Sequence, residues 1–140
     1  MIFKYAKDFH LTLCMHPLMV SVLGYAAFVA SEIDIPFVVT DTVSDLHKDK
    51  KLGRTSASHR EGRAADISLR GWTTDDIDNF KLKLEQKFGK YGAISSRDNQ
   101  RRLVVVHTGT APHIHLQIDR KYQNEDVFPV LSQNQTDHME

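Results

Sequence analysis

The chain has 140 residues, of which 41% are hydrophobic and 26% charged, values typical of one globular domain with a single core. Eighteen lysine and arginine residues balance eighteen aspartate and glutamate residues, so no global charge draws the protein to nucleic acid or to an anionic membrane. A single cysteine, Cys14, excludes an internal disulfide, and its apolar surroundings predict a buried thiol. We expect one domain over residues 1–125 and a flexible C-terminal tail over 126–140.

The first ten residues lack the apolar core of a secretory signal, and no cleavage site follows them. The longest apolar stretch, residues 17–30, is shorter than the roughly 20 residues that a membrane-spanning helix needs. We therefore expect a protein that is made in the cytosol and does not insert into a membrane. A role outside the cell would require another exit route.

The first half of the chain predicts a helix, a strand and a long loop. Pro17 suits the first turn of a helix that runs to about Ser31. The apolar face of this helix includes Leu18, Val22, Tyr25 and Val29. The β-branched run over residues 36–40 predicts a buried strand. Residues 41–58 are polar and basic without a period, which predicts a loop.

The second half of the chain predicts three or four strands and the most clearly bounded helix. Residues 64–69 predict a strand, and a helix follows from the N-cap Thr73 or Thr74 to Gly89. Two strands joined by a polar turn are expected at 93–95 and 103–107, and an alternating strand at 113–119. This order favours an α+β fold, with helices packed on one face of a mainly antiparallel sheet.

Four residues form a pattern typical of a metal site. His113 and His115 are two apart on a predicted strand, so their side chains point to the same face. His59 and Asp66 are separated by small residues, among them Gly62, which permits a backbone conformation that a side chain would oppose. Together with one imidazole of the pair, His59 and Asp66 would give a catalytic zinc its three protein ligands and leave one position open. One carboxylate and two neutral imidazoles leave a net charge of +1, which favours polarising a carbonyl and activating water.

Each half of this pattern has a simpler explanation. Alternating polar residues on an exposed strand can produce a His-x-His pair by chance. A histidine seven residues before an aspartate is still weaker evidence for a metal site. Their co-occurrence favours the metal. A metal-free scaffold is disfavoured because Asp66, between Ala65 and Ile67, would then be an unpaired carboxylate near the core.

Two segments resemble a known enzyme family. "SHREGRAADI", residues 58–67, resembles the first zinc motif, SxHxxGxAxD, of the LAS group of zinc peptidases. This group includes D-alanyl-D-alanine carboxypeptidases, D-Ala-D-Ala dipeptidases, phage L-alanyl-D-glutamate endopeptidases and the penicillin-insensitive murein endopeptidase. "APHIHLQI", residues 111–118, is similar to their closing motif, and the signalling domain of hedgehog proteins shares both. The resemblance covers residues 37–118 and implies a hedgehog/DD-peptidase-like fold.

The resemblance also implies roles for individual residues. His59, Asp66 and His115 match the ligands of one zinc ion per chain. His113 matches a histidine beside the zinc-bound water and is our preferred general base, with His107 as the alternative. In the carboxypeptidase branch a glutamate three residues before the last ligand is the base, and Pro112 stands there in this chain.

Other positions depart from the family pattern. Enzymes of the group carry an arginine after the strand "vTSGyR" to hold a substrate carboxylate, whereas this chain has "VVTDTVSD". Either Arg54 replaces that arginine, or the substrate presents no terminal carboxylate there, which favours an endopeptidase. Ser58 is a further candidate for substrate binding. Asp41 and Asp45 resemble a calcium-binding stretch of hedgehog, although a solvated loop is favoured because calcium needs six to eight oxygen ligands.

The resemblance therefore implies a zinc metallopeptidase whose substrate is the stem or cross-bridge peptide of bacterial peptidoglycan. We expect an endopeptidase of the phage lytic type, either an endolysin released through a holin or a peptidase carried in a virion. The alternatives are a D-Ala-D-Ala carboxypeptidase and a non-catalytic, zinc-containing binding module of the hedgehog type.

Overall fold

A five-stranded sheet organises the chain in the computed structural model, which describes residues 1–95 and 97–123. The strands are β1 (Ile2–Phe3), β2 (Val38–Asp41), β3 (Ala64–Ser68), β6 (Val104–His107) and β7 (His113–Gln117). Their order across the sheet is β1-β2-β3-β7-β6, with β1 parallel to β2 and the other pairs antiparallel. A second, two-stranded sheet pairs β4 (Ala93–Ile94) with β5 (Arg101–Arg102). The tail expected over residues 126–140 lies outside the described residues.

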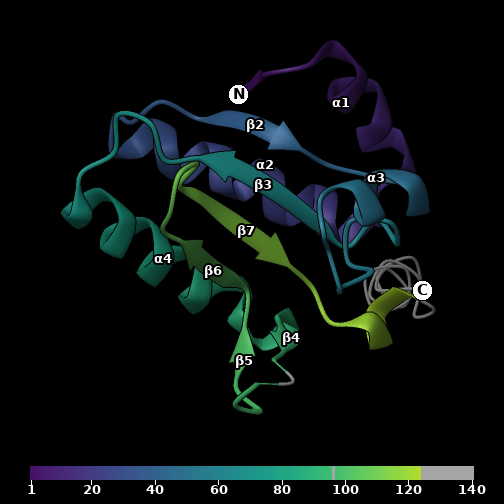
Figure 1. Ribbon diagram of the computed structural model, residues 1–140. Coiled ribbons are helices and arrows are strands. Elements are labelled where there is room, and N and C mark those ends of the chain that lie inside the picture. Colours follow the sequence, from purple (N-terminus) through teal and green to yellow (C-terminus); the bar gives the residue numbers. More distant parts are fainter. Residues whose placement is uncertain (96, 124–140) are drawn as a thin grey trace, which may run out of the picture.

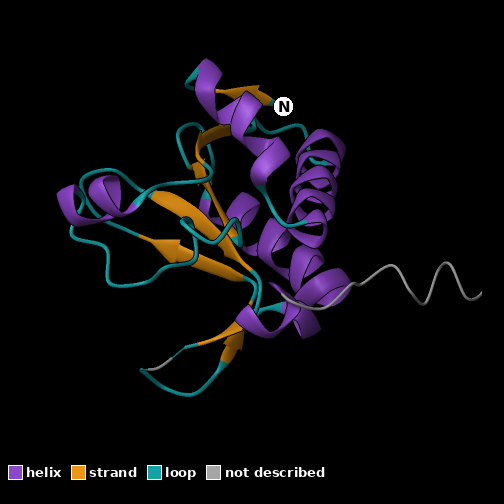
Figure 2. Cartoon of the chain, turned by 90° about the vertical axis from the view of Figure 1, so that its right-hand side faces the viewer, coloured by secondary structure: helices purple, strands orange, loops and turns teal. Residues whose placement is uncertain are grey.

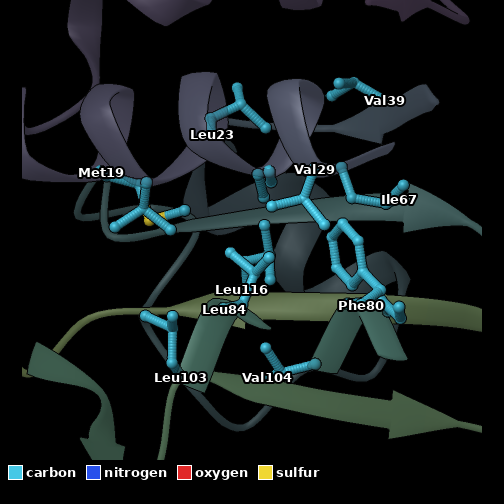
Figure 3. Close-up of a cluster of buried hydrophobic side chains, with 14 of the residues drawn as sticks. Met19, Leu23, Val29, Val39, Ile67, Phe80, Leu84, Leu103, Val104 and Leu116 are labelled. Atoms are coloured by element: carbon cyan, nitrogen blue, oxygen red, sulfur yellow. The ribbon is translucent and has the colours of Figure 1, made fainter. Parts of the chain in front are cut away.

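Two long helices cover one face of the large sheet (Figures 1 and 2). They are α2 (Pro17–Glu32) and α4 (Thr74–Phe88), while α1 (Ala6–Leu11) and α3 (Leu46–Lys51) are short. Three 3₁₀ turns lie at Thr12–Cys14, Gly89–Tyr91 and Arg120–Gln123. The core lies between the long helices and the sheet and contains the fully buried Met19, Ile67, Phe80, Leu84 and Leu116 (Figure 3). The α+β class with a mainly antiparallel sheet is therefore confirmed.

Both predicted helices are confirmed to within a residue or two of their expected ends. Pro17 is the first residue of α2, where its missing N–H costs no hydrogen bond. Thr73 caps α4 by accepting from the N–H of Asp76 at 3.1 Å, and the Asp76 carboxylate accepts from the N–H of Thr73 at 2.8 Å. No helix in the described part of the chain combines the length and hydropathy needed to cross a bilayer.

The loop predicted over residues 41–58 is wrong in its middle, where α3 forms. The sequence of this helix has no apolar period, because a capping hydrogen bond and ion pairs stabilise it in place of apolar contacts. Asp45 caps it by accepting from the N–H of Lys48 at 2.7 Å, and the buried Asp49 accepts from the Ser44 hydroxyl at 2.6 Å and from Arg60 at 3.1 Å. Ion pairs and capping thus replace the apolar stripe on which sequence periodicity depends.

Two further predictions are corrected. The strand at Ala93–Ile94 pairs with Arg101–Arg102, which the sequence placed in a polar turn, and not with residues 103–107. Cys14 is exposed, because the 3₁₀ turn that it ends directs the next residue, Met15, into the core. In the first case, residues expected in a turn form a strand, and in the second, a residue expected to be buried is exposed.

Candidate metal centre

The centre of the sheet brings two of the predicted ligands together. Asp66 of β3 lies directly opposite His115 of β7 in the antiparallel register. Their sequence neighbours Ile67, Ile114 and Leu116 are fully buried in the core. Because side chains alternate along a strand, Asp66 and His115 project from the face that α2 and α4 do not cover.

The third ligand, His59, lies on the turn that leads into β3, and that turn requires a glycine. Gly62 has a φ of +70°, a conformation that side chains rarely adopt. A Cβ there would also lie 2.9 Å from the carbonyl oxygen of Cys14. The Gly62 carbonyl accepts from the N–H of His16 at 2.9 Å, which fastens the turn to the start of α2. The special conformation predicted for Gly62 is therefore confirmed.

The three side chains present one donor atom each to a common space. His59 Nε2 lies 3.1 Å and His115 Nδ1 2.9 Å from Asp66 Oδ1. All three donor atoms lie within 4.8 Å of one another, a group that is suited to holding a metal ion. Ligands about 2.0 to 2.1 Å from a tetrahedral zinc are separated by roughly 3.3 Å. The two separations from Asp66 Oδ1 are therefore close to those expected around such an ion.

Carbonyl oxygens orient both imidazoles from behind. The Nδ1–H of His59 donates to the carbonyl of Thr42 at 2.6 Å. The Nε2–H of His115 donates to Gln117 Oε1 at 3.1 Å, and Gln117 Nε2 donates to the Arg102 carbonyl at 3.3 Å, which fixes the orientation of the amide. With those protons placed, the inner nitrogens direct lone pairs toward an ionised carboxylate, an arrangement that needs a proton or a metal cation between them.

The buried carboxylate and imidazole influence each other strongly. Burial raises the pKa of Asp66, but the hydrogen bonds from His115 and His59 outweigh it and hold that pKa well below its usual range. Burial lowers the pKa of His59, but the Asp66 carboxylate outweighs it and raises that pKa above its usual value. Each group therefore favours the charged form of the other.

Arg54 is engaged by protein carboxylates. Its guanidinium contacts Asp41, and it donates to Asp49 Oδ1 and Asp66 Oδ2 at 3.4 Å each. Asp66 is thus paired even in the absence of a metal, so the expectation that it would be left unpaired in a metal-free protein was wrong. Ser58 is buried, and its hydroxyl lies 3.4 Å from His115 Nε2, behind the ligand.

Asp41 and Asp45, the two carboxylates considered as calcium ligands, form hydrogen bonds with other groups of the protein. Asp41 is buried and accepts from Lys48 Nζ at 2.7 Å and from the N–H of Thr42 at 3.1 Å. Asp45 caps α3. Asp41 is therefore not part of a solvated loop, as the sequence favoured, but of an ion-pair network that closes one side of the metal centre.

The three ligands line an open cavity of about 450 Å³, to which His107 and His113 also contribute. The imidazoles of His107 and His113 stack at a centroid distance of 4.7 Å across the β6–β7 pair. The Nδ1–H of His113 donates to the carbonyl of Ala111 at 3.0 Å, which leaves Nε2 as its acceptor. Burial, with the neighbouring His113 and His115, lowers the pKa of His107. Both candidate bases thus lie on the same cavity as the ligands.

Sequence patterns did not identify the groups that orient the ligands. Gln117 follows His115 by two residues, so strand alternation would have placed it on the same face. No local signal marks Thr42, because its carbonyl reaches His59 only through the tertiary fold.

Comparisons with protein-family models, with curated proteins and with solved structures found no match for this chain. The resemblance to the LAS zinc peptidases therefore rests on the two sequence motifs alone. The geometry of the metal centre supplies the independent basis for a function.

Proposed function

We propose that this protein is a zinc-dependent peptidase of the LAS type, with a hedgehog/DD-peptidase-like fold, that hydrolyses peptide bonds in bacterial peptidoglycan. The observation that carries the proposal is the group of His59, Asp66 and His115, whose donor atoms converge at the wall of an open cavity. The outer nitrogen of each imidazole is already held by an oxygen acceptor, as in preorganised metal sites.

The donor set suits zinc. Two imidazoles and one carboxylate are ligands that Zn²⁺ accepts, and three protein ligands are typical of a catalytic rather than a structural site. When bound, zinc would supply a Lewis acid that polarises the scissile carbonyl and activates water. The chain's own contribution is to hold the ligand side chains close together, which the β3–β7 register and the turn at Gly62 do.

His113 is the residue that we propose to move the proton. His113 lines the cavity, and because its Nδ1–H is held by the Ala111 carbonyl, Nε2 is the nitrogen that can accept a proton. His107 stacks on it and is the alternative base. Its lowered pKa favours the neutral imidazole, which is the form that accepts protons near neutral pH.

The contacts of Arg54 favour an endopeptidase over a carboxypeptidase. A carboxypeptidase needs a cation to hold the terminal carboxylate of its substrate. Arg54 lines the cavity, but it already pairs with Asp41, Asp49 and Asp66. A substrate carboxylate would have to compete with these contacts, so we propose cleavage within the stem peptide.

A non-catalytic binding module remains the second candidate because of one feature of the cavity. Among the described residues that line the cavity, Asp66 is the single carboxylate, and it is itself a proposed metal ligand. None of these residues is a glutamate that could act as the general base. In this alternative the metal would serve structure, and the cavity would recognise a peptide without cleaving it.

Digestion of purified peptidoglycan by the zinc-loaded protein separates these functions. We expect new amino termini at one stem-peptide bond by mass spectrometry, abolished by EDTA and by Asp66→Ala, and retained in the matched control Asp75→Ala on α4. Loss of terminal D-Ala alone would indicate a carboxypeptidase. One bound zinc per chain without any release would favour the binding module.

A further inference from the structure

The strand β6 has a free edge beside the metal centre. Among the described residues it pairs only with β7, because it is the last strand of the sheet. The N–H of Gln117 donates to the Leu103 carbonyl at 2.9 Å, and Val105 lies opposite His115. In an antiparallel pair the hydrogen-bonded positions alternate, so Val104 and Val106 direct their backbone N–H and C=O groups away from β7.

One end of this edge is already occupied by the protein. Glu85 Oε1 of α4 accepts from the N–H groups of Leu103 and Val104 at 3.0 and 2.9 Å. The carbonyl of Val104 and both backbone groups of Val106 have no partner among the described residues. An unpaired edge of this kind is a template for an extended peptide, which pairs with it as an added strand.

A groove of about 640 Å³ follows this edge and leads to the metal centre. The residues of β6 form one side, and the β4–β5 hairpin, which Figure 1 shows projecting beside the start of β6, forms the other. Ser56, His107 and His115 line both the groove and the metal cavity. A chain lying in the groove would therefore be carried to the ligands.

The groove carries unbalanced positive charge. Lys81 and Arg97 line it and form no ion pair with a described residue. Arg102 and Asp98, which line it too, neutralise each other through hydrogen bonds of 2.9 and 2.5 Å. Glu85 is engaged by the two backbone N–H groups. A peptide that carries carboxylates is the complementary ligand.

We propose that the substrate binds as an extended acidic peptide along the free edge of β6, pairing with the Val104 carbonyl and with the N–H and carbonyl of Val106. Its carboxylates face Lys81 and Arg97, and its scissile bond reaches the metal centre past the side chains of His107 and His115, which line both the groove and the cavity. This inference rests on the proposed function, because it names the binding mode and charge of that peptidase's substrate.

Val106→Pro tests the backbone pairing directly. Proline removes the N–H that faces the groove, and the β6–β7 hydrogen bonds remain because that N–H does not take part in them. Val106→Ala is the matched control, since it shortens the same side chain and keeps the N–H. We expect Val106→Pro to lower kcat/KM for peptidoglycan about tenfold below Val106→Ala, with zinc content and Tm close to those of the control. Equal kcat/KM in the two folded variants would overturn the proposal.

Hydrogen exchange of the wild-type, zinc-loaded protein tests the same edge without a substitution. The probe is synthetic L-Ala-γ-D-Glu-L-Lys-D-Ala with both amino groups acetylated and both carboxylates free, which gives it a net charge of −2. We expect it to slow exchange at the Val106 N–H and to leave Leu103, already bonded to Glu85, unchanged. Protection without hydrolysis would support the groove and count against the peptidase. Hydrolysis without protection would overturn the groove and leave the peptidase intact.

Charge reversal tests the acidic class of the peptide. Arg97→Glu should raise KM for the free-carboxylate peptide roughly two- to fivefold and have little effect on the same peptide with its carboxylates amidated. Lys50→Glu, on the exposed surface of α3, is the matched control. An equal increase in KM for both peptides would contradict the proposed contact between Arg97 and a substrate carboxylate.

Discussion

Alternate residues of β3 and β7 lie on opposite faces of the sheet, and the side chains on the two faces have different surroundings. Ile67 and Ile114 lie on the helix-covered face and are fully buried in the apolar core. Asp66 and His115, their immediate neighbours, lie on the opposite face and form the candidate metal centre. One face stabilises the sheet by removing apolar surface from water, and the other uses that sheet as a rigid support.

The faces also differ in how their residues are held. Core side chains are held by many weak contacts, so a missing methyl group is felt as a loss of stability. The candidate ligands are held by a few directed hydrogen bonds to distant segments, such as that from the His59 Nδ1–H to the Thr42 carbonyl. We therefore expect substitutions on the two faces to separate metal binding from folding, and the following predictions are ordered by the size of the expected effect.

The largest effect should follow Asp66→Ala. It removes the ligand that contacts both imidazoles and leaves the core face of β3 unchanged. We expect the loss of one-to-one zinc binding, measured by equilibrium dialysis with metal analysis, in a domain that still gives the wild-type circular dichroism spectrum. Stoichiometric zinc in the folded variant would contradict the assignment of Asp66 as a ligand.

The neighbouring substitution Ile67→Ala should do the reverse. It leaves a cavity beneath β3, and we expect the free energy of unfolding to fall by about 2 to 5 kcal/mol, measured by urea denaturation of the metal-free protein. The folded fraction should bind zinc within a few-fold of wild type. A large loss of zinc affinity in the folded protein would show that the two faces are coupled.

Sequence patterns predicted much of this arrangement because its determinants are local. Strand alternation placed His113 and His115 on one face, and the spacing of small residues marked the turn at Gly62. The end of the helix over residues 74–88 followed from its capping residues and apolar period. Each of these signals lies within one short continuous stretch of the chain, where a pattern can be recognised.

The missed features depend on contacts between distant segments. Helix α3 has no apolar stripe, and it is anchored by Asp49 through Ser44, Arg54 and Arg60. Arg54, one of two alternatives considered for a substrate carboxylate, contacts three aspartates that the sequence did not identify as its partners. Which charged groups meet is decided by tertiary structure, so sequence spacing alone could not assign their partners.

A smaller effect should follow Gln117→Leu, which tests the support behind a ligand. The Gln117 amide accepts the Nε2–H of His115 and so keeps Nδ1 directed at the metal position. We expect zinc affinity to fall roughly 10- to 100-fold, measured by competition with a chelator, with little change in Tm. Gln117→Glu keeps an acceptor and should retain the affinity. Ser58→Ala removes the more distant hydroxyl, 3.4 Å away, and should change it less.

An unchanged affinity in Gln117→Leu would show that His115 needs no orientation from this side. The same loss in Ser58→Ala as in Gln117→Leu would instead assign the role to the general packing around His115. Cobalt substitution adds a readout that stability does not affect, because the visible absorption of bound Co²⁺ changes with the geometry of its ligands.

The smallest effect concerns the protonation of His59. The pKa of His59 is raised in the metal-free protein because Asp66 accepts from its imidazolium, although burial opposes this. A raised folded pKa stabilises the fold fully below the unfolded value of about 6.5, and that contribution is lost as pH rises through the folded pKa. The pKa of Asp66 is lowered, so its carboxylate stays ionised through this range and adds no slope.

In the proposed site, zinc binding and protonation compete for the same lone pair of His59. We expect apparent zinc affinity to rise about tenfold per pH unit below the raised pKa of His59 and to level off above it. Calorimetry at pH 6 in buffers of different ionisation enthalpy should count about one proton released per zinc bound. Release of no proton would mean that His59 is neutral without metal, and that its lone pair faces the Asp66 carboxylate with no cation between them. The contact between His59 and Asp66 would then be repulsive before a metal binds. The apolar packing on the opposite face of the sheet would have to maintain the positions of these side chains.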